Sequence, residues 1–262
     1  MDYLEHLQQE SQRFRQAVLD APADGRVPTC PDWDAEDLLW HLAEVQWFWG
    51  QVVGRSITAP PEADALEAAR PSDRASLVAF FDAASSELQA VLAERAPETP
   101  AWTWAPEQTV GFIRRRQAHE ALIHRLDAEL TLGARTPMDT GLSADGIDEV
   151  LRIMYGGLPS WGTFTPDVDR MLRIETADTS DSWLVTLGTF RGTDPTDDTS
   201  YDQPDISIAE ADVGAPVSAT ITGRASDLDC WLWHRPTEDS VERSGDTAVL
   251  AAFDAVIAPG IN

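Results

Sequence analysis

The sequence contains no lysine, so its 19 basic residues are all arginines, and they are outnumbered by 45 acidic residues. The resulting net charge of −26 would repel both a nucleic acid backbone and an anionic membrane, so we exclude these partners. No apolar run approaches the roughly 20 residues that a helix needs to cross a bilayer. The opening MDYLEHLQQESQRFRQ also lacks the basic start and apolar run of a signal peptide. We therefore expect a soluble, cytoplasmic protein.

Cysteine is scarce as well, with only Cys30 and Cys230, which lie far apart in the sequence. In a cytosolic chain, two such residues are more often separate thiols than a disulfide. We assign neither cysteine to a bridge.

The first half of the chain has the pattern of amphipathic helices separated by proline-rich breaks. Asp34, with Asp37 three residues later, is a typical helix start, and that helix should end at Gly54. The predicted helices are about 3–20, 35–53, a third from about 73 through Val91, and 107–132. The segment 57–71 is expected to be a loop. Four such helices predict an up-and-down four-helix bundle.

A further helix, predicted at about 143–155, leads to GGLPSWG, and beyond it the pattern changes. RMLRIET, SWLVTLGTF and PVSATITG are typical of strands, whereas RGTDPTDDTSYDQPD looks like acidic turn material. SDLDCWLWHRP and DTAVLAAFDAVI then predict two helices. We therefore expect a two-domain α+β protein: a helical bundle at 1–158 and a small α+β domain at 159–262 with a mostly antiparallel sheet.

The helix that follows Asp34 carries a histidine on its apolar side. His41 lies between Leu38 and Leu42 at helical spacing, so it should face the bundle interior or its rim. Trp33, Trp40, Trp47 and Trp49 surround this region in the sequence. We expect some of these tryptophans to line the mouth of a site and at least half of them to be core.

The last bundle helix has a face that becomes polar as it proceeds. Gln117, Glu120, His124 and Asp127 follow the spacing of one helix face. Glu120 and His124, four residues apart, can reach one ion, and His41 from a facing helix can supply a third ligand. Two histidines and a carboxylate with an open position are typical of a catalytic divalent site for zinc or a similar metal. Asp127 is placed to orient the imidazole of His124.

Spacing alone also allows a purely structural role for these histidines. A histidine on an apolar face is more often a hydrogen-bonded core residue than a ligand. His119 and His124 are five residues apart, so HEALIH is not the metalloprotease motif, and His119 is expected on the flank of the helix. The run Arg114-Arg115-Arg116 is expected to be a solvated face, and pairing with nearby acidic residues is left open.

The stretch CPDWDAEDLLWHLAEVQWFW, followed later by HEALIHRLDAEL, resembles the mycothiol-dependent maleylpyruvate isomerase family. The resemblance implies a DinB-like bundle whose metal is held by His41, Glu120 and His124. VSATITGRASDLDCWLWHRP resembles the family's sterol-carrier-like C-terminal domain. That domain is implied to supply a catalytic arginine, for which the candidates here are Arg235 and Arg224.

The resemblance also implies mycothiol, a sugar-linked cysteine, as a cofactor beside a divalent metal, with zinc expected. A coordinated thiol is deprotonated. The thiolate could add to an activated double bond, permit rotation and leave, which is isomerisation, or it could displace a leaving group and stay, which is S-transfer. The expected partners are a low-molecular-weight thiol and a small electrophile. Two alternatives stay open: a metal-dependent hydrolase, and a binding module for a metal or ligand without turnover.

Overall fold

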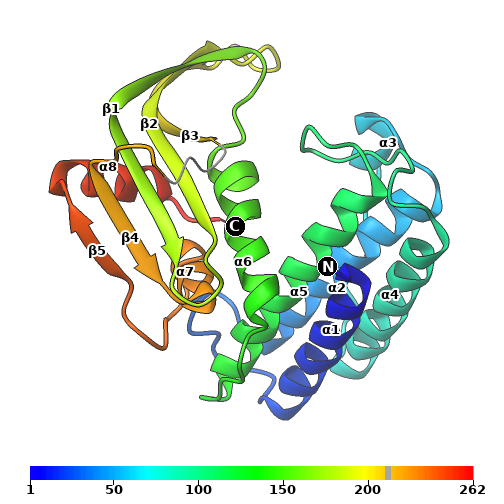
Figure 1. Cartoon of the computed structure of the whole chain (residues 1–262). Coiled ribbons are helices and arrows are strands. Elements are labelled where there is room, and N and C mark those ends of the chain that lie inside the picture. Colours follow the sequence, from blue (N-terminus) through cyan, green and yellow to red (C-terminus); the bar gives the residue numbers. More distant parts are fainter. Residues whose placement is uncertain (210–213, 262) are drawn as a thin grey trace. The chain divides into compact units, whose positions relative to one another are not determined.

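The computed structural model describes residues 1–209 and 214–261, and the chain divides into two compact units, Met1–Pro137 and Met138–Asn262 (Figure 1). The expected boundary at 158/159 differs from this division. Helix α6 (Thr140–Glu149) packs against α7 (Ala225–Leu232), and the short π-helix η1 (Val150–Tyr155) continues α6, so all three belong to the second unit. Within the described residues, no helix is long and apolar enough to cross a membrane.

The first unit is the expected four-helix bundle. Its long helices are α1 (Tyr3–Asp20), α2 (Ala35–Gly54), α4 (Arg74–Glu94) and α5 (Val110–Thr131). Helix α1 packs mainly on α5 and α2 mainly on α4, while α2 also contacts α5. This last contact matters most for function, because it brings the predicted ligands on two distant segments to one place.

Each bundle helix begins at a side chain that accepts backbone hydrogen bonds of its first turn, namely Asp2, Asp34, Asp73 and Thr109. At Asp34 the cap is reciprocal, because Asp37 accepts in return from the backbone N–H of Asp34. Such a cap stabilises a helix by about 1 kcal/mol. The predicted start of α2 is confirmed, and it fixes which turn presents His41.

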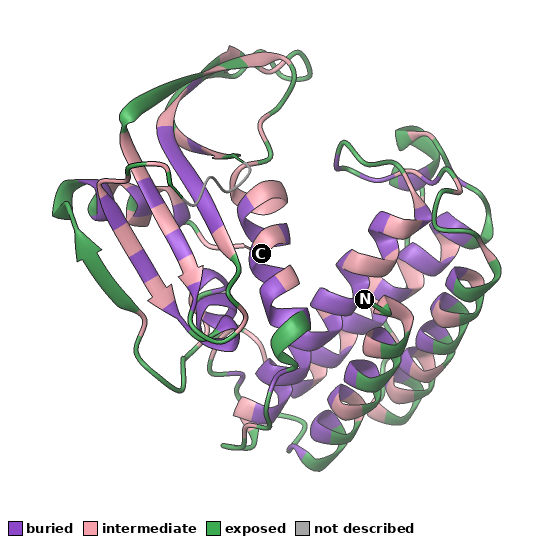
Figure 2. Ribbon diagram, in the orientation of Figure 1, coloured by how far each residue is buried: buried purple, intermediate pink, exposed green. Residues whose placement is uncertain are grey.

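The bundle core is aromatic and aliphatic. Phe14 and Phe81 pack with ring centroids 5.3 Å apart, and Leu38 and Leu42 of α2 are fully buried against them. Figure 2 shows buried residues continuing along the inner faces of these helices. The segment 57–71, expected to be a loop, contains the short helix α3 (Pro60–Asp64). Proline is tolerated in a first helical turn, which explains why the proline pair did not prevent it.

The second unit is built on a five-stranded sheet in the order β3-β2-β1-β4-β5. The strands are β1 (Gly162–Thr176), β2 (Ser182–Thr193), β3 (Ser200–Ala209), β4 (Ala219–Gly223) and β5 (Glu242–Gly245). Only β1 and β4 pair in parallel among the described strands, so the expectation of a mostly antiparallel sheet is confirmed. Helices α7 and α8 (Thr247–Ile257) follow β4 and β5, as predicted.

Two features of the second unit differ from the sequence prediction. Residues 200–205 were expected to be turn material, which is wrong, since they form the first half of edge strand β3. Helix α6 begins at Thr140, capped by Asp139, rather than at Ser143. In both cases the polar residues that are common in turns are also compatible with a solvent-facing edge strand or with a helix cap.

Candidate metal site

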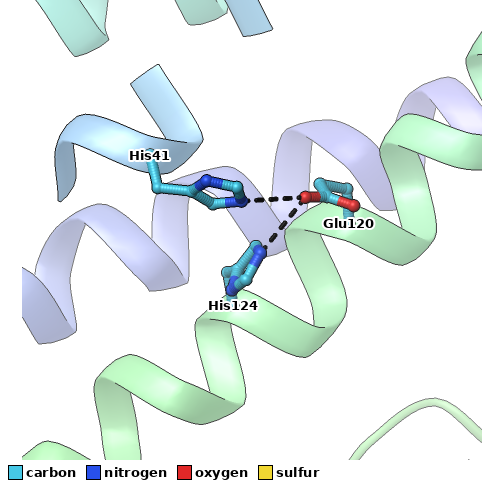
Figure 3. Close-up of side chains that lie close together, drawn as sticks. All are labelled: His41, Glu120 and His124. Atoms are coloured by element: carbon cyan, nitrogen blue, oxygen red, sulfur yellow. Dashed lines mark hydrogen bonds and ion pairs between the residues drawn. The ribbon is translucent and has the colours of Figure 1, made fainter. Parts of the chain in front are cut away.

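The three predicted ligands converge in the first unit. Figure 3 shows His41 reaching from α2 toward Glu120 and His124, which lie one turn apart on α5. Oε1 of Glu120 lies 3.3 Å from Nε2 of His41 and 3.1 Å from Nε2 of His124. The two imidazole rings are nearly perpendicular, with centroids 4.7 Å apart. One carboxylate oxygen thus meets both histidines.

This spacing suits a small divalent ion. The three potential ligand atoms all lie within 4.8 Å of one another. A tetrahedral zinc ion with ligands at about 2.0–2.1 Å separates neighbouring ligand atoms by about 3.3 Å, which matches the two nitrogen–oxygen distances. The side chains are 30, 16 and 10% exposed for His41, Glu120 and His124, so a ligand from solvent can approach from the His41 side. The donor set fits zinc or a similar ion with one position left open.

His124 is oriented by a chain of hydrogen bonds on its other nitrogen. Oδ2 of Asp127 lies 3.0 Å from Nδ1 of His124, and the hydroxyl of Thr29 donates to Oδ1 of Asp127 at 2.6 Å. Asp127 is fully buried. A carboxylate on Nδ1 keeps Nε2 as the nitrogen available to an ion, which is the usual support of a metal-binding histidine. The predicted role of Asp127 fits this geometry, and Thr29 extends it.

Burial lowers the pKa of His124, but the hydrogen bonds that its ring donates to Asp127 and Glu120, together with their negative charges, outweigh this effect and raise the pKa to about 9. The metal-free protein therefore holds a proton on His124 at neutral pH, between two carboxylates. A divalent ion competes with that proton for the same nitrogen.

Glu120 is held by a second partner, Arg116, which was expected to face solvent. Arg116 donates from Nη2 to Oε2 of Glu120 at 2.7 Å and is only 3% exposed. The expectation that the run Arg114-Arg115-Arg116 is a solvated face is wrong for Arg116, and also for Arg114, which donates to the carbonyls of Leu92 and Arg95 at the end of α4. The sequence leaves pairing of this run with nearby acids open, and the spacing of Arg116 and Glu120, four apart on a helix, is the signal that could have identified this pair.

Of the four tryptophans Trp33, Trp40, Trp47 and Trp49, only Trp49 is buried, so the expectation that at least half of them are core is wrong. The indole of Trp33 lies 4.9 Å from the imidazole of His41, centroid to centroid. Trp33 and Trp40 line a depression beside His41, whereas Trp49 is buried. His119, expected on the helix flank, is buried, with its ring 6.3 Å from that of Tyr3.

The two candidate catalytic arginines both lie in the second unit, around α7. Arg224 immediately precedes α7, and its Nη1 donates to exposed Asp239 at 3.3 Å. Arg235 follows α7, donates from Nη1 to the carbonyl of Trp233 at 2.7 Å, and places its guanidinium 6.0 Å from the centroid of that indole. The two arginines thus offer a cation at either end of α7.

Comparisons with known proteins cover nearly the whole chain. The N-terminal domain model of the mycothiol maleylpyruvate isomerase family matches residues 4–129, and the model of its C-terminal domain matches residues 141–252. A crystal structure of the mycothiol-dependent maleylpyruvate isomerase has a TM-score of 0.56 at 12% identity, covering 94% of this chain and 93% of that one. A histidine-to-alanine mutant of that enzyme matches with the same TM-score and coverage at 13% identity. No curated protein sequence matches.

Proposed function

The chain belongs to the mycothiol maleylpyruvate isomerase family, and we propose that it is a mycothiol-dependent metalloenzyme, either an isomerase or an S-transferase. In this proposal His41, Glu120 and His124 hold one divalent ion, zinc above all, and a thiol activated there attacks a small electrophile. The proposed location is the cytoplasm, where low-molecular-weight thiols stay reduced.

The observation that carries the proposal is the meeting of three ligand atoms from two helices within 4.8 Å. Two imidazoles and a partly buried carboxylate so close together are costly in a core unless they share a proton or an ion. When bound, the ion would keep the sulfur of the thiol cofactor as a thiolate at neutral pH, which is the nucleophile that both isomerisation and S-transfer need.

The chain's own residues prepare the site. Asp127, supported by Thr29, fixes the ring of His124, while Arg116 occupies one oxygen of Glu120 and leaves the other toward the histidines. The indole of Trp33 against His41 limits the movement of that ring and the access of water to it. These contacts place the donors before any ligand arrives, which lowers the cost of binding one.

We further propose that Arg235 or Arg224 binds a carboxylate of the substrate. An acidic protein with a net charge of −26 needs a defined cation to hold an anionic substrate. Both arginines carry donors suited to a carboxylate.

The test is an assay of metal-loaded and chelator-treated protein with mycothiol and a panel of electrophiles that includes maleylpyruvate. We expect turnover only with both metal and thiol present. Hydrolysis of an ester or amide without thiol would support a metal-dependent hydrolase instead. Metal binding with neither thiol binding nor turnover would support a binding module.

A further inference from the structure

Two glutamines lie completely inside the helical bundle, although glutamine is mostly an exposed residue. Gln46 of α2 is 0% exposed and Gln117 of α5 is 1% exposed. Nε2 of Gln46 donates to the hydroxyl of Ser11 on α1 at 2.9 Å, but its Oε1 has no hydrogen-bond partner among the described residues. Within the same part of the chain, neither Oε1 nor Nε2 of Gln117 has a partner. Three buried amide atoms therefore need a partner, because a buried polar group without one is costly.

Both glutamines lie on the faces of their helices that form the bundle core. Gln46 lies four residues after Leu42 and seven after Leu39, so the three share one face of α2. Gln117 lies eleven residues, or about three turns, before Ala128, so these two share one face of α5. Leu39, Leu42 and Ala128 belong to one cluster of buried residues. The two glutamines thus face a common interior.

Helices α2 and α5 run past each other in opposite directions. Thr29, which precedes α2, donates to Asp127 in the second half of α5. At the other end, the backbone N–H of Trp102, before α5, donates to the carbonyl of Ile57, after α2. The start of α2 therefore lies near the end of α5, and its end lies near the start of α5.

The two glutamines lie at the same level of this antiparallel pair. His41 contacts both Glu120 and His124, so it lies opposite the turn between them. Gln46 follows His41 by five residues on α2, and Gln117 precedes Glu120 by three residues on α5. At 1.5 Å per residue, both glutamines are displaced from the ligand cluster by about 5–8 Å in the same direction.

The three unsatisfied atoms specify the chemistry of the missing partner. Two are acceptors, Oε1 of Gln46 and Oε1 of Gln117, and the third is a donor, Nε2 of Gln117. A metal ion or an ammonium ion offers nothing to the donor, and an apolar molecule satisfies none of the three atoms. A water molecule donates two hydrogen bonds and accepts one here, and buried waters typically make about three.

We propose that an internal water molecule bridges Gln46 and Gln117 and so joins α2 to α5 beside the ligand cluster. The site does not depend on the proposed function or on a bound ion. Helix α2 packs mainly on α4, so the bridge adds a specific polar link to the helix pair that brings His41 to its partners. Fully satisfied buried polar networks favour one arrangement of a core over others.

A crystal structure of the full chain, at a resolution that shows ordered water, tests the site directly. The expected result is a water molecule within hydrogen-bonding distance of Oε1 of Gln46 and of both amide atoms of Gln117. Amides that bond only to protein groups, with no water between them, would overturn the proposal. This experiment uses wild type, so it decides the question even if a variant fails to fold.

A double-mutant cycle tests the bridge in solution. Gln46→Met and Gln117→Met keep the length of the side chain and remove its amide. If one water joins the two amides, either single variant already breaks the bridge. The double variant should therefore lose less free energy of unfolding in urea than the sum of the two single losses. The matched control pairs Gln117→Met with Gln89→Met, because Gln89 of α4 already donates to Ser85, and these two losses should add. Additive losses for Gln46 and Gln117 would contradict the bridge.

Discussion

Arg116 donates a hydrogen bond of 2.7 Å to Oε2 of Glu120, while Oε1 of the same carboxylate lies 3.1 and 3.3 Å from the nitrogens of His124 and His41. The guanidinium of Arg116 thus hydrogen-bonds Oε2 of Glu120, and Oε1 is left to interact with the histidines or with an ion. Burial raises the pKa of Glu120, but the charge of Arg116 and the hydrogen bonds from His124 and His41 outweigh burial and hold the pKa well below its usual value. Arg116 keeps the carboxylate ionised in a partly buried site.

Replacing Arg116 should therefore make metal binding more sensitive to acid. In Arg116→Met the pKa of Glu120 rises, so protons compete for this ligand at higher pH, and the midpoint of acid-induced metal release moves upward. Arg116→Lys, which keeps the charge, should restore most of the wild-type midpoint. Metal content after dialysis across a pH series measures the effect. Arg55→Met, at an exposed position at the end of α2, is the control; identical midpoints for Arg116→Met and this control would argue against the role of Arg116.

Removing His124 should abolish tight metal binding. Wild type is expected to retain one divalent ion per chain after gel filtration, and His124→Ala to retain almost none, because two remaining ligands rarely hold zinc against a chelator. His6→Ala, on α1 and outside the cluster, should behave like wild type. Elemental analysis decides the outcome. Full occupancy in His124→Ala would mean that the ligand set is wrong.

Much of the bundle and of the candidate site was predictable from the sequence, because helix capping and helical periodicity depend on residues that are close together in the chain. The cap at Asp34 set the start of α2, and helical periodicity placed Glu120 and His124 on one face. That His41 meets them depends on α2 packing against α5, which no local rule supplies. The apolar-side position of His41 allowed that meeting, and the family resemblance strengthened the expectation.

The features that sequence reasoning missed depend on partners far away in the sequence or on edges facing solvent. Strand β3 lies at the edge of the sheet, where polar residues face solvent. The first half of β3 therefore has an amino-acid composition that is also typical of a turn. The guanidinium of Arg114 donates hydrogen bonds to backbone carbonyls at the end of α4. This contact exists only because the two helices pack together in the folded protein. The boundary after Pro137 follows from α6 packing on α7, and the two helices are far apart in the chain.

The proton on His124 should make the stability of the metal-free protein depend on pH. The pKa of His124 is raised from 6.5 to about 9, so protonated His124 contributes stability that is complete below about pH 6.5 and is lost as the pH rises through about 9. We expect the Tm of chelator-treated protein to fall between pH 7 and 9.5, and to fall less in His124→Gln. Zinc binding near pH 7.5 should release a proton, measurable by calorimetry in buffers of different ionisation enthalpy. A variant with the same decline in Tm as wild type would contradict this assignment.

Arg125, next to His124 in sequence, should be essential for stability. It is fully buried, and it donates to Oε2 of Glu10 at 2.7 Å and to Oε2 of Glu129 at 2.9 Å. Arg125→Ala leaves two buried carboxylates with only the partly exposed Arg13 as a cation, which should cost about 3–5 kcal/mol of the free energy of unfolding in urea. Arg125→Met combined with Glu10→Gln and Glu129→Gln should lose less, since no buried charge is left unpaired and Arg13, which loses its partners, is partly exposed. A loss in Arg125→Ala that is no larger than in the triple variant would refute the charge argument.

The arginines around α7 should separate substrate binding from metal binding. Arg235 is positioned by the carbonyl and the indole of Trp233, whereas Arg224 pairs with exposed Asp239, so Arg235 is the stronger candidate for a substrate carboxylate. Arg235→Gln should lower kcat/KM for a carboxylate-bearing electrophile by about tenfold to a hundredfold, the value of a hydrogen bond between charged groups, with unchanged zinc content. Arg224→Gln is the matched variant at the other end of α7. The methyl ester of the same substrate should be turned over equally by wild type and Arg235→Gln, because it lacks the charge that the arginine meets. Equal losses on acid and ester, or loss of zinc with the arginine, would show that Arg235 acts on the fold and not on the substrate.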